Sequence, residues 1–64
     1  ERNEAIVFAP TITIKSSPAE SGTDLFVLHE GTKVKLLDKV GEWSEILLAD
    51  GNRGWIPTNQ IEII

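Results

Sequence analysis

A chain of 64 residues has room for one hydrophobic core, because a domain of this size buries only about 60% of the surface that its unfolded chain exposes. The absence of Cys and the single His exclude a disulfide framework and a structural zinc site, so no metal or cofactor is expected. With 41% hydrophobic and 25% charged residues the chain is expected to fold, and its net charge of −4 argues against nucleic acid as a partner.

Short runs of β-branched and aromatic residues alternate with clusters of Gly, Pro, Ser, Asn and Asp, which predicts strands joined by turns. Between them, Ser16–Thr23 is expected to form a long polar loop and Asp50–Asn52 a tight hairpin turn with positive φ angles. Gly54 is expected to let another backbone approach closely. The strands are predicted at Ile6–Phe8 continuing into Thr11–Lys15, then at Phe26–Leu28, Lys33–Asp38, Trp43–Leu48, Arg53–Ile56 and Ile61–Ile63.

Successive side chains of a strand point to opposite faces of a sheet, so alternation separates core residues from surface residues. Trp43 has odd spacing to Ile46, and Trp55 has odd spacing to Ile56, so both tryptophans are predicted to lie outside the core. A large aromatic side chain there packs against something or binds something. The predicted core residues are Val7, Ile12, Ile14, Phe26, Leu28, Val34, Leu36, Ile46, Leu48, Ile56 and Ile61.

Four segments of the chain carry motifs that follow one another in a recognisable order. They are Ile12–Pro18 (ITIKSSP), Leu28–Val34 (LHEGTKV), Gly41–Ile46 (GEWSEI) and Asp50–Ile56 (DGNRGWI). Together they cover nearly the whole chain and resemble the bacterial SH3 domain family. The resemblance implies an all-β, SH3-like small barrel of five to six short antiparallel strands with a long RT-type loop, here Ser16–Thr23. More narrowly, the chain resembles the C-terminal SH3 domain of tetratricopeptide proteins encoded in Bacteroides aerotolerance operons.

Gly54–Ile61 is also similar to the ending of eukaryotic SH3 domains, Gly-x-Ile-Pro-x-Asn-Tyr-Val, in which the Pro and the Tyr line the ligand groove. Pro57 matches that Pro, whereas Gln60 replaces the Tyr, and the chain contains no Tyr. Polyproline helices are recognised by aromatic-lined grooves. A proline-rich ligand is therefore not expected.

Trp43 resembles the groove tryptophan of SH3 domains. With Pro57 it would form an apolar platform for a peptide or a sugar ring, or else it merely covers the barrel edge. Trp55 either shares in binding or packs against the long loop. The predicted ligand-binding residues are Trp43, Pro57, Trp55, Glu42 and Gln60. The acidic residues Glu20, Asp24, Glu42 and Glu45 either flank the groove, favouring a cationic or amine-bearing ligand, or form a solvated surface.

Catalysis is not expected, because His29 is the only imidazole and a domain this small leaves no deep cleft for paired carboxylates. The resemblance implies a non-catalytic binding module that engages a peptide or a peptidoglycan fragment, such as a muropeptide, in a shallow Trp/Pro groove. Its setting would be a larger protein of the cell envelope, on the periplasmic side. The alternatives are a structural domain that packs against neighbouring domains and an accessory domain that completes the cleft of a cell-wall hydrolase.

Residues 1–64 are expected to form a single domain that is monomeric in isolation. Because the chain starts at Glu1 without Met, we expect it to be part of a longer protein. No apolar run approaches the roughly 20 residues that a membrane-spanning helix needs.

Overall fold

Seven short antiparallel strands form one sheet in the computed structural model, which describes residues 3–64. The order across the sheet is β3-β2-β6-β5-β4-β1-β7. The prediction of an all-β fold is thus confirmed. The elements are β1 (Glu4–Val7), β2 (Thr11–Lys15), β3 (Asp24–His29), β4 (Lys33–Val40), β5 (Trp43–Leu47), β6 (Arg53–Pro57), a 3-10 turn η1 (Thr58–Gln60) and β7 (Ile61–Ile63).

The first predicted stretch forms two strands rather than one, which is why residues 3–64 contain seven strands instead of five to six. β1 pairs with β4 and β7, whereas β2 pairs with β3 and β6. Pro10, which has no backbone N–H to donate, lies in the short connection between them. The other predicted strands are found with small shifts: β2 and β7 have the predicted bounds, and β4 continues to Val40.

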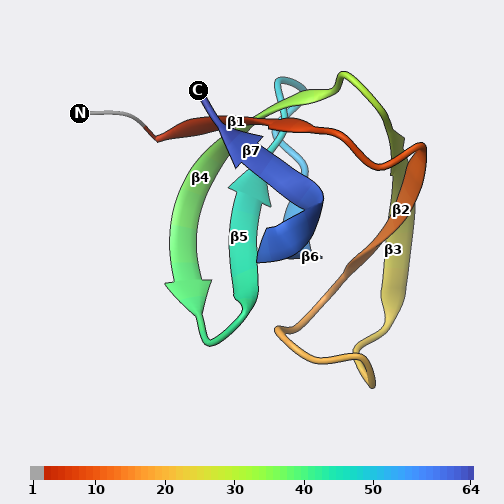
Figure 1. Ribbon diagram of the computed structural model, residues 1–64. Helices are drawn as coiled ribbons and strands as arrows, with labels where there is room; N and C mark the ends of the chain where they lie inside the picture. The colour runs from red at the N-terminus through yellow and green to blue at the C-terminus, as the bar shows by residue number, and fades with distance from the viewer. Residues whose placement is uncertain (1–2) are drawn as a thin grey trace.

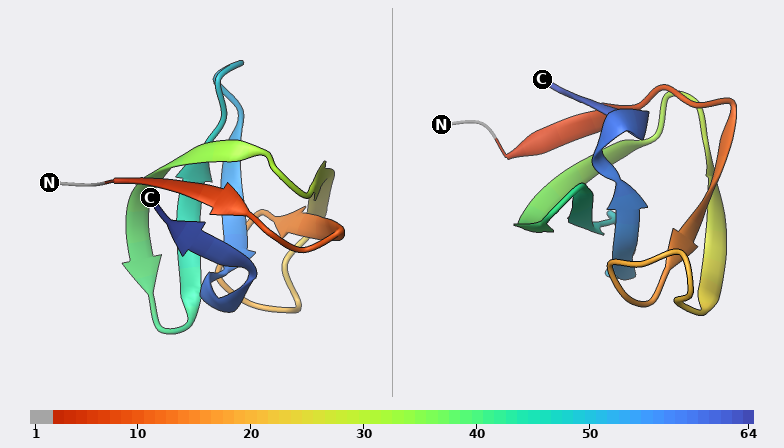
Figure 2. Two further views of the ribbon diagram at one scale, coloured as in Figure 1. Left: turned by 45° about the horizontal axis from the view of Figure 1, so that its top comes forward. Right: turned by 60° about the horizontal axis from the view of Figure 1, so that its bottom comes forward.

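The sheet is strongly curved, so that the β2–β3 hairpin lies on one side of the molecule and the β4–β5 hairpin on the other (Figure 1). β1 and β7 cross over one end of the molecule, and both described ends of the chain lie on that side (Figure 2). β2 meets β6 at one register pair, Lys15 opposite Trp55. This junction joins the β2–β3 hairpin to the rest of the sheet.

Gly54 makes that junction possible, as the sequence predicted. A Cβ atom built on Gly54 would overlap the Cγ2 atom of Ile14 and lie 3.0 Å from the backbone oxygen of Lys15. The same Cβ would lie 3.2 Å from Cδ1 of Leu25, a residue at the bulge of the β2–β3 pair. The bulge thus places Leu25 beside this junction, where its side chain remains 46% exposed.

The core lies between the β2–β3 hairpin and strands β4 to β6. Its largest fully buried side chains include Ile14, Ile46 and Ile56, one each from β2, β5 and β6, and burying each stabilises the fold by roughly 1.5–3 kcal/mol. All eleven predicted core residues are either buried or packed against the buried cluster. The prediction missed two small buried residues, Ala5 and Ala9, because it weighed only large apolar side chains.

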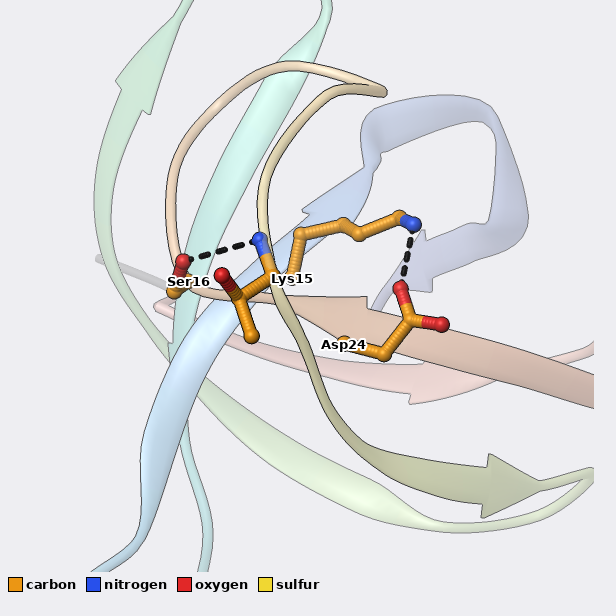
Figure 3. A network of polar contacts seen from close by, with 4 residues as sticks. Lys15, Ser16 and Asp24 are labelled. Atoms are coloured by element: carbon orange, nitrogen blue, oxygen red, sulfur yellow. Dashed lines mark hydrogen bonds and ion pairs between the residues drawn. The ribbon is translucent and has the colours of Figure 1, made fainter.

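The long loop Ser16–Thr23 is closed at its base by polar contacts (Figure 3). The N–H of Ser16 donates to the Thr23 oxygen at 2.9 Å, and the N–H of Thr23 donates to Oγ of Ser16 at 3.1 Å. Next to them, the Nζ of Lys15 forms an ion pair with Asp24. The loop is thus held as a compact projection from the β2–β3 hairpin.

The predicted turn at Asp50–Asn52 is also present. Gly51 has φ +93°, a conformation that glycine adopts without strain. Its N–H donates to the Leu48 oxygen at 3.0 Å, and Oδ1 of Asp50 accepts from the N–H of Asn52 at 3.0 Å. These bonds set the register of β5 and β6.

Candidate functional site

A shallow, open groove of about 510 Å³ lies where the long loop, the β4–β5 turn and η1 meet. Trp43 and Pro57 supply its apolar wall. The lining residues are Glu20, Lys39, Gly41, Glu42, Trp43, Pro57, Thr58, Asn59 and Gln60. Four of the five predicted ligand-binding residues, all except Trp55, therefore lie around one hollow.

The β5–β6 register places Trp43 directly opposite Pro57. In β5 the buried positions are Ser44 and Ile46, so Trp43 points to the outer face and is half-buried, as the alternation predicted. Directly opposite residues on one face of a sheet have their Cβ atoms about 4.5–5.5 Å apart. The indole and the pyrrolidine ring are therefore neighbours on one surface.

A pair of hydroxyl groups under this surface ties η1 to β5. The Oγ of Ser44 and Oγ1 of Thr58 are 2.7 Å apart and share a hydrogen bond. The backbone N–H of Thr58 donates to the Glu42 oxygen at 2.8 Å. Ser44 is only 4% exposed, so its hydroxyl needs this partner. The two contacts hold the turn that carries Asn59 and Gln60 against the strand that carries Trp43.

The charges around the groove are unevenly distributed. Glu20 approaches from the long loop and Glu42 from the β4–β5 turn, and Lys39 is the one cation among the described lining residues. The other two candidate acidic residues do not line the groove: Asp24 is paired with Lys15, and Glu45 lies opposite Trp55. The groove carries one more negative than positive side chain, which favours cationic groups.

Trp55 lies outside the groove. It is two positions from Pro57 on the same face of β6, and its register partners are Lys15 on one side and Glu45 on the other. Lys15 is well covered, with a side chain only 17% exposed, and it belongs to the base of the long loop. The surroundings of Trp55 are thus those of a packed residue in the sheet.

Lys39, Thr58 and Asn59 line the groove but were not predicted. Simple alternation from Val34 would put Lys39 on the outer face, but a bulge between Leu36 and Asp38 shifts the pattern, so Lys39 lies opposite the buried Ser44. Thr58 and Asn59 had a signal in the sequence. They follow Pro57 within the segment that resembles the eukaryotic SH3 ending.

Across residues 3–64, no three His, Cys, Asp or Glu side chains are grouped so as to hold a metal ion. Over the same residues, no helix has the length and apolar character needed to cross a membrane.

A curved antiparallel sheet, a long loop and a 3-10 turn beside a shallow groove define a small β-domain with a surface suited to binding. The bacterial SH3 domain model matches residues 10–62, and the chain belongs to this family, as its motifs predicted. Bacterial SH3 domains are small, generally non-catalytic modules that bind proteins or peptidoglycan, and they commonly occur in extracytoplasmic, cell-wall-associated proteins. No curated protein shows a significant match to this chain.

Proposed function

We propose that this domain binds a peptide or a peptidoglycan fragment in the Trp43–Pro57 groove, as the ligand-binding module of a larger cell-envelope protein. The observation that carries the proposal is the convergence of Trp43, Pro57, Glu42 and Gln60, from β5, β6, the β4–β5 turn and η1, on one hollow of about 510 Å³. An outward indole next to a proline ring offers a flat apolar surface, and the polar rim supplies hydrogen-bonding groups.

The charge of the rim indicates the ligand chemistry. Glu20, from the long loop, and Glu42, from the β4–β5 turn, line the same hollow, so a ligand with a free amino group or a basic side chain gains attraction there. Amine-bearing muropeptides and basic peptides both meet this description. The groove is shallow and small, so the affinity is expected to be micromolar or weaker.

The test is a titration of the isotope-labelled domain, followed by amide and indole N–H signals. Muropeptides with a free amino group and basic peptides are compared with the same ligands after N-acetylation. We expect shifts at the Trp43 indole, Glu42 and Thr58, a weaker response to acetylated ligands, and little change at the Trp55 indole. Trp43→Ala should abolish the response, with Val27→Ser on β3 as a matched surface control.

The proposal is wrong if none of these ligands moves the Trp43 signals, or if they move the Trp55 indole instead. Equal binding of acetylated and free-amine ligands would remove the role assigned to Glu20 and Glu42 while leaving the apolar platform in place.

A further inference from the structure

A second hollow, of about 340 Å³, adjoins the groove. Lys39 and Thr58 line both, so the two hollows are neighbours at these residues. The second hollow opens toward β4 and β7. Its lining residues are Leu36, Leu37, Asp38, Lys39, Ser44, Thr58 and Ile63.

Aliphatic side chains dominate the wall of this second hollow. Leu37 is the extra residue of the bulge between Leu36 and Asp38 and is 41% exposed, and β7 contributes Ile63, which is 52% exposed. Two large aliphatic residues at the surface of a 64-residue domain forgo the stabilisation that burial would give them. A ligand that covers these two side chains would remove their apolar surface from water and so gain binding free energy.

The two hollows therefore present a sequence of chemical groups. Glu20 and Glu42 lie in the first, Lys39 lies at the junction, and Leu37 and Ile63 lie in the second. A complementary ligand carries a cation at one end and an aliphatic group at the other, and it is extended enough to cross the junction. Sugar rings have no aliphatic side chains, whereas a polypeptide has them at regular intervals along an extended backbone.

We infer that the two hollows form one continuous site for an extended polypeptide segment that carries a basic side chain and, a few positions away, an aliphatic side chain. The inference rests on the proposed function of the first hollow and narrows its ligand to a polypeptide. The basic side chain lies against Trp43 between the two glutamates, the backbone passes Lys39, whose ammonium donates to peptide carbonyl groups, and the aliphatic side chain fills the space beside Leu37.

The test uses synthetic peptides that carry one Lys and one Leu separated by two to five Ala residues, with binding measured by calorimetry and by labelled-domain spectra. At the best spacing, replacing the Leu of the peptide by Ala should weaken binding about fivefold to tenfold. Leu37→Ser in the domain should give the same loss. Combining both changes should lose no more than either alone, because each removes the same contact.

Val27→Ser is the matched control, because Val27 is 50% exposed, also lies on a strand and lines neither hollow. It should leave every affinity unchanged. Amide spectra of each variant check that the fold is retained, and Ile63→Ser gives a second way to alter the aliphatic wall.

The outcomes separate the two proposals. If the peptides bind through Trp43 but do not respond to the Leu changes in peptide or domain, the continuous site is wrong and the first groove stands. If Trp43→Ala has no effect on any peptide or muropeptide, the proposed function itself is wrong. A muropeptide without a long aliphatic side chain that binds as tightly as the best peptide would overturn the restriction to polypeptides.

Discussion

Trp43 and Trp55 lie on the same outer face of two paired strands, yet their surroundings differ. Trp55 belongs to a row of register partners that crosses five strands, whereas the row that contains Trp43 ends at Pro57, where the groove begins. The first row consists of Asp24, Lys15, Trp55, Glu45 and Asp38, and the second of Val40, Trp43 and Pro57. Both indoles have a strand on each side, so neither the face nor the immediate neighbours separate them; what differs is that the Trp43 row stops at Pro57 beside the groove, whereas the Trp55 row continues across β2 and β3.

The largest effect is expected where β2 approaches β6, beside Trp55. Gly54→Val should lower the free energy of unfolding by about 3 kcal/mol, because its side chain would overlap Ile14 and push β2 away from β6. Chemical denaturation followed by tryptophan fluorescence measures this. Gly51→Ala is the control, because a Cβ at this position meets nothing within 4 Å. A φ of +93° is strained for alanine but not for glycine, so this variant should lose only about 1–2 kcal/mol of stability. Equal losses for the two variants would show that the close approach at Gly54 is unimportant.

The next prediction tests the two indoles against each other. Trp55→Ala should destabilise the domain by about 2 kcal/mol, because Lys15 and Glu45 on the neighbouring strands would lose their contact with the indole. It should leave ligand binding unchanged. Trp43→Ala should cost about 1 kcal/mol or less and weaken ligand binding more than tenfold. Thermal unfolding and calorimetric titration measure the two quantities. The opposite assignment, with binding lost in the Trp55 variant, would reverse the comparison.

A smaller loss is expected from the hydroxyl pair under the groove. Ser44→Ala should cost about 1 kcal/mol of stability, because it leaves the Thr58 hydroxyl without its partner. In a variant that already carries Thr58→Val, the hydrogen bond is absent, so adding Ser44→Ala should lower the stability by much less. Denaturation of the four proteins of this cycle gives the coupling, and additive losses would mean that the pair does not hold η1 in place.

The smallest effect concerns the ion pair at the base of the long loop. Asp24→Asn should cost less than about 1 kcal/mol, because Asp24 is 68% exposed and its pairing with Lys15 is screened by water. The loss should shrink further in 1 M salt. The Glu4–Lys33 pair, with exposed side chains 3.5 Å apart, provides the control and should behave in the same way. A loss at Asp24 that persists in high salt would show that Lys15 is held beside Trp55 by this contact.

Much of the fold follows from the sequence, because alternation in short strands is a local property. The positions of Val34, Ile46 and Ile56 were each predicted from their neighbours alone, and all are buried. The bulge in β4 could not be predicted in this way. It depends on how β4 pairs with β5, and it reverses the faces of the residues that follow it, so that Lys39 lies opposite the buried Ser44 instead of on the face of Trp43.

The groove was predicted through motif resemblance rather than through alternation. Alternation puts Trp55 and Pro57 on one face of β6 and does not separate them. Only the register with β2 shows that Trp55 has a strand on each side while Pro57 lies at the edge of the hollow. Leu47 lies on the outer face of β5, opposite Lys35 and Arg53, and long basic side chains of this kind cover apolar neighbours with their aliphatic stems.

The bonds from Thr58 to Ser44 and to the backbone of Glu42 have a kinetic consequence. Under the proposed function, a groove whose wall is anchored before any ligand arrives needs no rearrangement on encounter, so complexes are expected to form quickly, and a shallow contact to release them quickly. Long residence at a target surface would then come from several such modules acting together, or from a dense array of ligands, rather than from one tight complex.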